Sequence, residues 1–265
     1  MHKLLISLLF IITFQTCLVA QDSIRRQEQN KYNFSQLVNE AGLLVIRPIK
    51  WNGCDWIKFG VVGVTTVALM QEDKKIRDFS QNNQKYPMNF LMEVGNQYGG
   101  FFFGPLLCVS LYTIGSVSKS NKTKKIGFEI AQGMLYSEGI SFISKGIIGR
   151  ARPSVSQSAF EFHPFTFFKS PYNSFPAGHI DAAFALSTVL SRNTNCGFLK
   201  VIAYLPAALT VVSRIYQDYH WASDVFIGAA IGYSVGNWVV NLHEKKDSRV
   251  QLTSLYPLTF KIGLN

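Results

Sequence analysis

The sequence has little that would support disulfide or metal chemistry. Its 265 residues include four cysteines. Cys17 lies near the end of the N-terminal segment that is expected to be removed as an export signal, and Cys54, Cys108 and Cys196 are scattered singly along the chain. Without Cys17, an odd, scattered set of three remains, which predicts neither a disulfide framework nor a zinc site. The chain also lacks zinc-finger spacing and a basic stripe interleaved with aromatic residues, which argues against a nucleic-acid partner.

Acidic residues are also few, with 16 against 26 basic ones and a formal net charge of +10. Charged residues make up 16% of the chain and hydrophobic ones 48%, a composition that excludes general disorder. The length suits one large domain, or a compact domain with a tail. The basic balance favours anionic partners, such as phosphates or the surface of an anionic membrane.

The N-terminus has the layout of an export signal over residues 1–20. Lys3 gives a short basic start, an apolar stretch follows, and small residues end at Ala20, so cleavage is expected before Gln21. An uncleaved anchor helix is the alternative. Residues 21–55 are interpreted as a polar exported lead-in that contains an amphipathic helix around Phe34–Leu44.

Apolar segments separated by polar, turn-like stretches predict an all-α fold, a bundle of about five or six apolar helices within residues 56–244. The C-terminal tail, residues 245–265, is expected to be short and irregular or β-like, because residues from Val250 alternate in character. The apolar segments are Phe59–Met70, Gly95–Val117, Ile126–Ile148, Ile180–Leu190, Phe198–Ile215 and Val225–Leu242.

A bundle of this kind is expected to associate with a membrane. Only Gly95–Val117 and Val225–Leu242 approach the roughly 20 apolar residues of a full span, so Phe59–Met70 is interpreted as a surface or re-entrant helix. The basic loop Ser118–Lys125 is expected in the cytoplasm, which would place Arg152 outside. A wholly soluble periplasmic bundle is the alternative.

Three stretches carry the candidate chemistry. "KGIIGRARP" places Lys145 seven residues before Arg152, two turns apart if the helix continues to Pro153. "SRIYQDYHWASD" contains Arg214 and puts His220 four residues before Asp224, close enough on a helix for the carboxylate to hold the imidazole. Between them lies "FPAGH", with Ala177, Gly178 and His179 at the expected start of a helix.

Each stretch alone has an ordinary structural explanation: basic residues at a helix end, a satisfied histidine–aspartate pair, and a helix-entry turn. Together they supply every role in phosphoryl transfer. Fixed cations stabilise the charge on the transferred group, and a glycine with helix-start amides allows close approach of an anion. One histidine can attack phosphorus while the other protonates the leaving oxygen, and no metal or other cofactor is required.

The three blocks resemble the type 2 phosphatidic acid phosphatase superfamily, which includes bacterial class A acid phosphatases, glucose-6-phosphatase and vanadium haloperoxidases. The resemblance covers about Phe128–Asn241. It implies that His220 is the nucleophile, that Asp224 holds its reactive tautomer, and that His179 is the general acid. It further implies a set of phosphate-binding residues: Lys145, Arg152, Arg214 and the Gly178 amide.

Ala177 departs from the family pattern, which has serine at this position. The loss of one hydrogen bond to a charged group costs roughly 1.5–3 kcal/mol, so slower turnover or altered specificity is expected, with backbone amides still available to phosphate. A non-catalytic lipid-phosphate binding protein is therefore one alternative, and it predicts no gain in turnover on Ala177→Ser. A soluble non-specific acid phosphatase and a vanadate-dependent haloperoxidase, with vanadate on His220, are the others.

The leading hypothesis is a metal-independent, exported phosphatase that hydrolyses lipid phosphate monoesters or diphosphates outside the cytoplasmic membrane. Phosphatidate, phosphatidylglycerol phosphate, isoprenyl diphosphates and lipid A phosphates are the candidate substrates. Other polar residues have no assigned role. Glu161 and His163 are interpreted either as head-group contacts or as part of a solvated loop, and Glu129 and Glu138 either as interior hydrogen-bonding residues or as substrate contacts. His243 is expected to end the last helix and to interact with its dipole.

Overall fold

The computed structural model describes residues 30–84 and 86–254, so the predicted export signal and the last eleven residues of the tail lie outside the described part. Within it the chain is helical, with one isolated bridge between Arg150 and Phe162. This confirms the predicted all-α fold. The helices are α2 (Phe34–Val45), α3 (Gly53–Asn82), α4 (Tyr86–Tyr98), α5 (Phe103–Val117), α6 (Asn121–Ile148), α7 (Gly178–Arg192), α8 (Gly197–Ile202), α9 (Leu205–Tyr216) and α10 (Ala222–Ser254).

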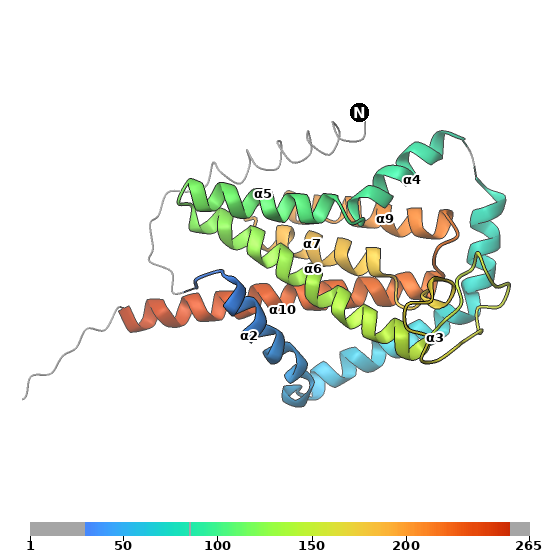
Figure 1. The fold of residues 1–265 in the computed structure, drawn as a ribbon, viewed down its shortest axis with the longest axis horizontal. Helices are drawn as coiled ribbons and strands as arrows, with labels where there is room; N and C mark the ends of the chain where they lie inside the picture. The colour runs from blue at the N-terminus through green and yellow to red at the C-terminus, as the bar shows by residue number, and fades with distance from the viewer. Residues whose placement is uncertain (1–29, 85, 255–265) are drawn as a thin grey trace, which may run out of the picture.

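Helices α5, α6, α7, α9 and α10 run side by side along the long axis of the molecule, and α7 lies among the others (Figure 1). Most residues of α7 are small or apolar, and the helix is buried on nearly every side. The main hydrophobic core surrounds it. Buried members of this core include Leu107, Leu111, Ile126, Ile130, Ala183, Leu186, Val189, Ala207 and Val240.

A seam of small residues brings α10 against α7. Gly228, Gly232 and Gly236 recur every four residues along one face of α10. A methyl group added at Gly228 would lie 2.7 Å from the carbonyl oxygen of Ala177, at the start of α7. Glycines at this spacing allow two helix backbones to approach closely, as in helix pairs within membranes. The seam therefore fixes the start of α7 against the first turns of α10.

The segment Gly95–Val117, expected as one helix, is divided into α4 and α5. The two helices meet at an angle of 50°. Gly99 lies in the break, and a side chain there would collide with the backbone oxygen of His179 and the side chain of Thr210. The two helices diverge at this break because they pack on different partners. Helix α4 packs on α9, whereas α5 packs along α6.

Helix α3 differs from the short surface or re-entrant helix predicted at Phe59–Met70. It begins at Gly53, after a capping box formed by Asn52 and Asp55, and continues through the charged stretch to Asn82. Its length makes it a candidate membrane span, and only 6% of its apolar window is buried inside the bundle. The short apolar segment therefore underestimated the length of this helix, because the helix extends beyond it at both ends.

Among the described residues, three helical segments are long and apolar enough to cross a membrane: Gly53–Asn82, Gly197–Tyr216 and Ala222–Lys245. The bent pair α4–α5 adds a fourth candidate. The prediction for Val225–Leu242 is confirmed, but α10 continues to Ser254. The first ten residues of the predicted irregular tail are thus helical.

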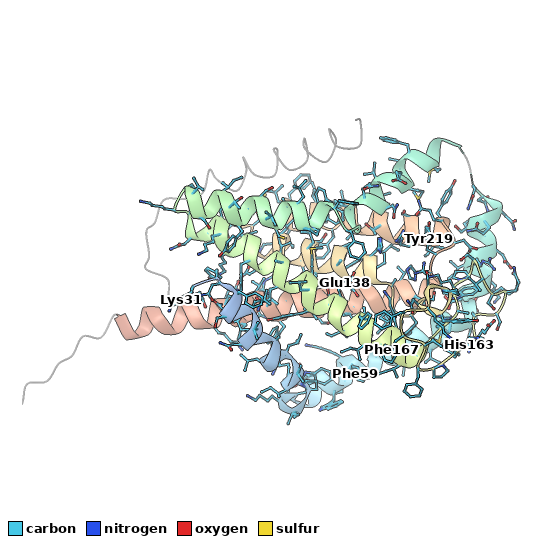
Figure 2. All side chains as sticks on the ribbon, in the orientation of Figure 1. Lys31, Phe59, Glu138, His163, Phe167 and Tyr219 are labelled. Atoms are coloured by element: carbon cyan, nitrogen blue, oxygen red, sulfur yellow. The ribbon has the colours of Figure 1, made fainter. Side chains whose placement is uncertain are left out.

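The basic loop and the first described residues lie at the same end of the bundle. The basic connection between α5 and α6 lies at one end, together with the first described residues: Lys124 Nζ donates to the carbonyl of Lys31 at 3.2 Å, and the Tyr112 hydroxyl to that of Tyr32 at 2.7 Å. Figure 2 shows Lys31 at this end and Tyr219 and His163 at the other.

A buried polar cluster fastens α2 to α6 and α10. His243 is fully buried and contacts Glu129 through Nδ1 at 2.9 Å and Glu40 through Nε2 at 3.0 Å. Gln132 donates to Glu40 at 2.7 Å, and Asn193 donates to Glu129 at 2.7 Å. The expectation that His243 ends the last helix and interacts with its dipole is therefore wrong, because α10 continues past it and its ring contacts two carboxylates. Glu129 is an interior hydrogen-bonding residue.

We expect His243→Ala to lower the free energy of unfolding by about 3–5 kcal/mol, because it leaves two buried carboxylates without their shared partner. Thermal unfolding of the detergent-purified protein measures the effect. His163→Ala, which removes a partly exposed histidine at the other end, is the matched control and should leave the melting temperature unchanged. Equal melting temperatures for the two variants would contradict the clamping role.

Candidate active site

All eight predicted site residues lie at the end of the bundle opposite the basic loop. Lys145 is in the last turn of α6, Gly178 and His179 open α7, and Arg214 is in the last turn of α9. His220 follows in the connection to α10. The three sequence blocks, which are distant in the chain, are thus brought together, as their pattern predicts. The remaining predicted site residues at this end are Arg152, Ala177 and Asp224.

The first block does not stay helical as far as Arg152. Helix α6 ends at Ile148, because Gly149 adopts a left-handed conformation with φ of 61° and its amide bonds to the carbonyl of Lys145. Arg152 is held from the following loop, where its amide donates to the carbonyl of Pro171 at 2.9 Å. Proximity of Lys145 and Arg152 therefore depends on this glycine turn and not on a shared helix face.

Lys145 reaches the start of α7 because position 178 has no side chain. A Cβ at Gly178 would lie 2.7 Å from Lys145 Nζ. The first amides of α7, those of Gly178 and His179, point out of the helix end, since an α-helix cannot satisfy its own first donors. An ammonium and free amides at one spot form a site for an anion.

The two arginines are spaced by an aromatic ring that sequence reasoning missed. Arg214 lies over the Tyr219 ring at 4.8 Å from its centroid, and Arg152 lies at 5.9 Å. Asn96 on α4 accepts from Arg214 Nη1 at 2.6 Å. Within the described part of the chain, the buried Nε atoms of both arginines have no hydrogen-bond partner. Such orphaned guanidinium donors suit the oxygens of a phosphate.

His220 is buried with one nitrogen fixed. Its Nδ1 lies 2.8 Å from the carbonyl oxygen of Ser174. A carbonyl only accepts, so Nδ1 carries the proton and Nε2 keeps its lone pair. Burial, and then the positive charges of Arg152, Lys145 and Arg214, hold the pKa of His220 well below its usual range. The imidazole is therefore neutral at physiological pH and has the lone pair that a nucleophile needs.

The predicted direct contact between Asp224 and His220 is not formed. Asp224 Oδ2 lies 4.0 Å from His220 Nδ1, which is too long for a hydrogen bond. The carboxylate instead accepts from the Ser174 hydroxyl at 2.5 Å and from the Trp221 amide at 2.9 Å. Asp224 therefore orients His220 indirectly, by holding Ser174, whose carbonyl contacts the ring.

Arg150 and Asp73 complete this support, and neither was a predicted site residue. The guanidinium of Arg150 is fully buried and donates to Asp224 at 2.5 Å and to Asp73 at 2.8 Å. Asp73 on α3 also accepts from the amide of Ser223, at the start of α10, at 2.8 Å. The first arginine in "GRARP", Arg150, was a signal that could have been followed, whereas Asp73 stands in a charged stretch that looks solvated.

Ala177, where the family pattern has serine, is fully buried. The backbone amides were expected to be available to phosphate, but the Ala177 amide donates to the backbone carbonyl of Asp224 at 3.1 Å. The amides of Gly178 and His179 remain for that role. Residue 177 thus joins the start of α7 to the start of α10.

The rim of the site is aromatic on one side and polar on another. The ring of Phe101, at the bend between α4 and α5, lies 6.2 Å from the His179 ring, edge to face. Glu161 and His163 pair with each other at 2.8 Å, and both are partly exposed, which favours the solvated-loop interpretation. Across the described residues, no three His, Cys, Asp or Glu side chains are grouped as metal ligands would be.

This arrangement can bind a tetrahedral anion and attack it. Three cations and the first amides of α7 surround a neutral imidazole with a free lone pair, and a second histidine opens the same helix. Positive charge at fixed positions stabilises the transition state of phosphoryl transfer.

Known proteins resemble the part of the chain that carries these residues. Residues 127–248 match the family model of the PAP2 superfamily. The Porphyromonas gingivalis protein named lipid A 1-phosphatase is 32% identical over 144 residues, 52% of this chain and 29% of its own length. The Arabidopsis thaliana protein named probable lipid phosphate phosphatase 4 is 30% identical over 123 residues, 36% of this chain and 40% of its own. The chain thus spans less than half of each relative.

A solved structure supports the fold. A transmembrane PAP2-type phosphatidylglycerolphosphate phosphatase from Bacillus subtilis superposes with a TM-score of 0.55 and 20% identity, over 70% of this chain and 95% of that one. At this identity the likeness concerns the fold alone. The residues that match the PAP2 superfamily model, 127–248, include all three motif blocks.

Proposed function

We propose that this protein is a metal-independent phosphatase that removes phosphate from lipid phosphate monoesters or diphosphates. The observation that carries the proposal is the state of His220, which is neutral, fixed at Nδ1 by Ser174 and placed within the field of three cations. The named activities of the two relatives, one on lipid A and one on lipid phosphates, support a lipid substrate.

In the proposed mechanism, Lys145, Arg152 and Arg214 bind the phosphate oxygens. The Nε2 lone pair of His220 attacks phosphorus, the bond from phosphorus to the leaving oxygen breaks, and His179 donates its proton to that oxygen. The bound phosphate adds the negative charge that favours protonated His179. Water then attacks the phosphohistidine, His179 takes its proton, and inorganic phosphate leaves with His220 restored.

A membrane-bound lipid is the substrate class that suits the surroundings of this site. Candidate spans lead to the site end, where α9 ends and α10 begins. A lipid lying in the bilayer could thus present its phosphate to the cations without leaving the membrane. Exposed apolar side chains on α3 support contact with acyl chains, among them Trp56, Ile57, Phe59, Val61, Val64 and Val67.

The site end is proposed to face away from the cytoplasm. Lysines concentrate at the opposite end, in the α5–α6 connection, and such loops stay cytoplasmic. Lys31 lies at that same end, through its contact with Lys124. A cytoplasmic basic loop and an exported stretch around Lys31 are therefore incompatible, and the proposal keeps the cytoplasmic loop.

The mechanism predicts that His220→Ala lowers phosphate release by roughly 10³-fold or more, because the attacking lone pair is removed. Phosphate release is measured with detergent-purified protein, a chelator, a panel of lipid phosphates and p-nitrophenyl phosphate. Rapid quenching should trap an acid-labile phosphoryl adduct that persists longer in His179→Ala and is missing in His220→Ala.

His163→Ala is the control, since it removes a partly exposed histidine at the same end. Turnover by folded His220→Ala at the wild-type rate would refute the proposed nucleophile. Lipid binding without phosphate release by the wild-type protein would instead favour the binding-protein alternative.

Single cysteines in a background without native cysteines test the orientation. With a membrane-impermeant maleimide applied to spheroplasts, Ser154→Cys near the site should be labelled directly. Lys31→Cys and Asn121→Cys should be labelled only after permeabilisation, because they lie at the basic end. The reverse pattern would place the site in the cytoplasm.

Arg150→Lys is expected to lower kcat/KM by roughly tenfold or more, because one ammonium cannot reproduce the forked contacts with Asp73 and Asp224. Arg192→Lys, at the other end of the bundle, is the matched control and should keep wild-type kinetics. Circular dichroism and melting temperature establish that each variant is folded. Full activity in folded Arg150→Lys would show that the buried network does not support catalysis.

A further inference from the structure

Glu138 is an acidic residue beside the phosphate-binding cations, and the mechanism above gives it no role. It lies on α6, seven residues before Lys145, so both side chains share one face of the helix. A Cβ at Gly178 would lie 2.7 Å from Lys145 Nζ and 2.9 and 3.1 Å from the two Glu138 oxygens. The carboxylate and the ammonium thus approach the same point at the start of α7.

The Glu138 carboxylate and the Lys145 ammonium nevertheless do not form an ion pair. Within the described part of the chain, neither Glu138 nor Lys145 forms a hydrogen bond or an ion pair within 4.0 Å. Glu72 and Lys75 on α3, by contrast, pair at 2.9 Å in the open. A glutamate needed only to neutralise Lys145 would be expected to contact it. Glu138 therefore keeps its acceptor capacity for another partner.

A second carboxylate behind Glu138 also has an unused oxygen. Asp181 on α7 is fully buried, and the hydroxyl of Ser141 on α6 donates to its Oδ2. Its Oδ1 has no partner among the described residues. Buried polar atoms are nearly always paired, so an orphaned acceptor next to a half-buried carboxylate indicates a place where a donor can bind.

Glu138 lies on the side of Lys145 that faces the middle of the bundle (Figure 2). The backbone positions of the two residues are about 10 Å apart along the axis of α6, although their charged groups converge at the start of α7. On the same helix it is flanked by Leu135 and Phe142, which are 59% and 48% exposed. With a lipid phosphate bound at Lys145, the atoms that join the phosphate to the acyl chains would lie beside Glu138.

The chemistry of a carboxylate then restricts the head group. It accepts hydrogen bonds from hydroxyl, amide and ammonium groups, gains nothing from ester carbonyls, and repels a second phosphate. We propose that Glu138 selects lipid phosphates that carry a hydrogen-bond donor on the skeleton next to the phosphate, as sugar and amino-alcohol lipids do. Phosphatidate and isoprenyl diphosphates are disfavoured. This inference rests on the proposed function, because it concerns the same site.

The experiment compares two lipids of matched chain length in mixed micelles. Ceramide 1-phosphate has an amide and a hydroxyl near its phosphate, whereas phosphatidate has only esters there. We expect wild-type kcat/KM to favour ceramide 1-phosphate by roughly tenfold or more, the scale of one hydrogen bond to a charged group. Glu138→Gln should bring the ratio to within about threefold, because it removes the charge but keeps the side-chain size.

Glu72→Gln, an exposed glutamate on α3, is the matched control and should retain the wild-type ratio. Equal ratios for wild type and Glu138→Gln would overturn the inference, and so would a wild-type preference for phosphatidate. Melting temperatures establish that both variants are folded.

Binding separates this inference from the proposed function. Affinities of the same two lipids are measured with His220→Ala and with the double variant His220→Ala/Glu138→Gln, where no turnover is required. A preference for ceramide 1-phosphate that disappears in the double variant supports the role of Glu138 even if the wild-type protein releases no phosphate. No preference in either variant overturns it even if hydrolysis is observed.

Discussion

The catalytic end of the bundle depends on one buried guanidinium. Arg150 has two carboxylates as partners, Asp73 from α3 and Asp224 from α10, and no exposure to solvent. An unpaired charge in such a place would be strongly destabilising, so the three segments that supply this network must assemble together. Asp224 in turn holds Ser174, and Ser174 fixes the ring of His220. The position of the proposed nucleophile, His220, is thus set by a network of buried contacts behind it.

The same positive field serves two purposes at this end. Lys145, Arg152 and Arg214 attract an anion, and they also disfavour a proton on His220, as burial does. A histidine in a neutral setting would be partly protonated near pH 6.5 and would lose its lone pair. The cations proposed to bind the phosphate therefore also keep the proposed nucleophile neutral. This coupling is a physical reason for a nucleophile that is buried beneath basic residues and is not exposed at the rim.

Local patterns carried much of the prediction. Apolar segments between polar turns indicated a helical bundle, and the order and spacing of three blocks identified residues that do lie together at one end. The misjudged features depend on distant partners. Arg150 and Asp73 meet across 77 positions, and His243 is paired with residues from α2 and α6. Helix α3 was underestimated because its charged half looks solvated, although Asp73 within it is buried.

The glycine seam between α7 and α10 has a consequence for motion. Backbones in such close contact leave no room for one helix to slide or rotate past the other. His179 opens α7, and Asp224 lies in the first turn of α10, so the proposed general acid and the residue that supports the proposed nucleophile lie on two tightly packed helices. Any opening that admits a lipid must come from other parts, such as the bend between α4 and α5 or the loop after α6. Substrate entry and catalytic alignment are thereby mechanically separate.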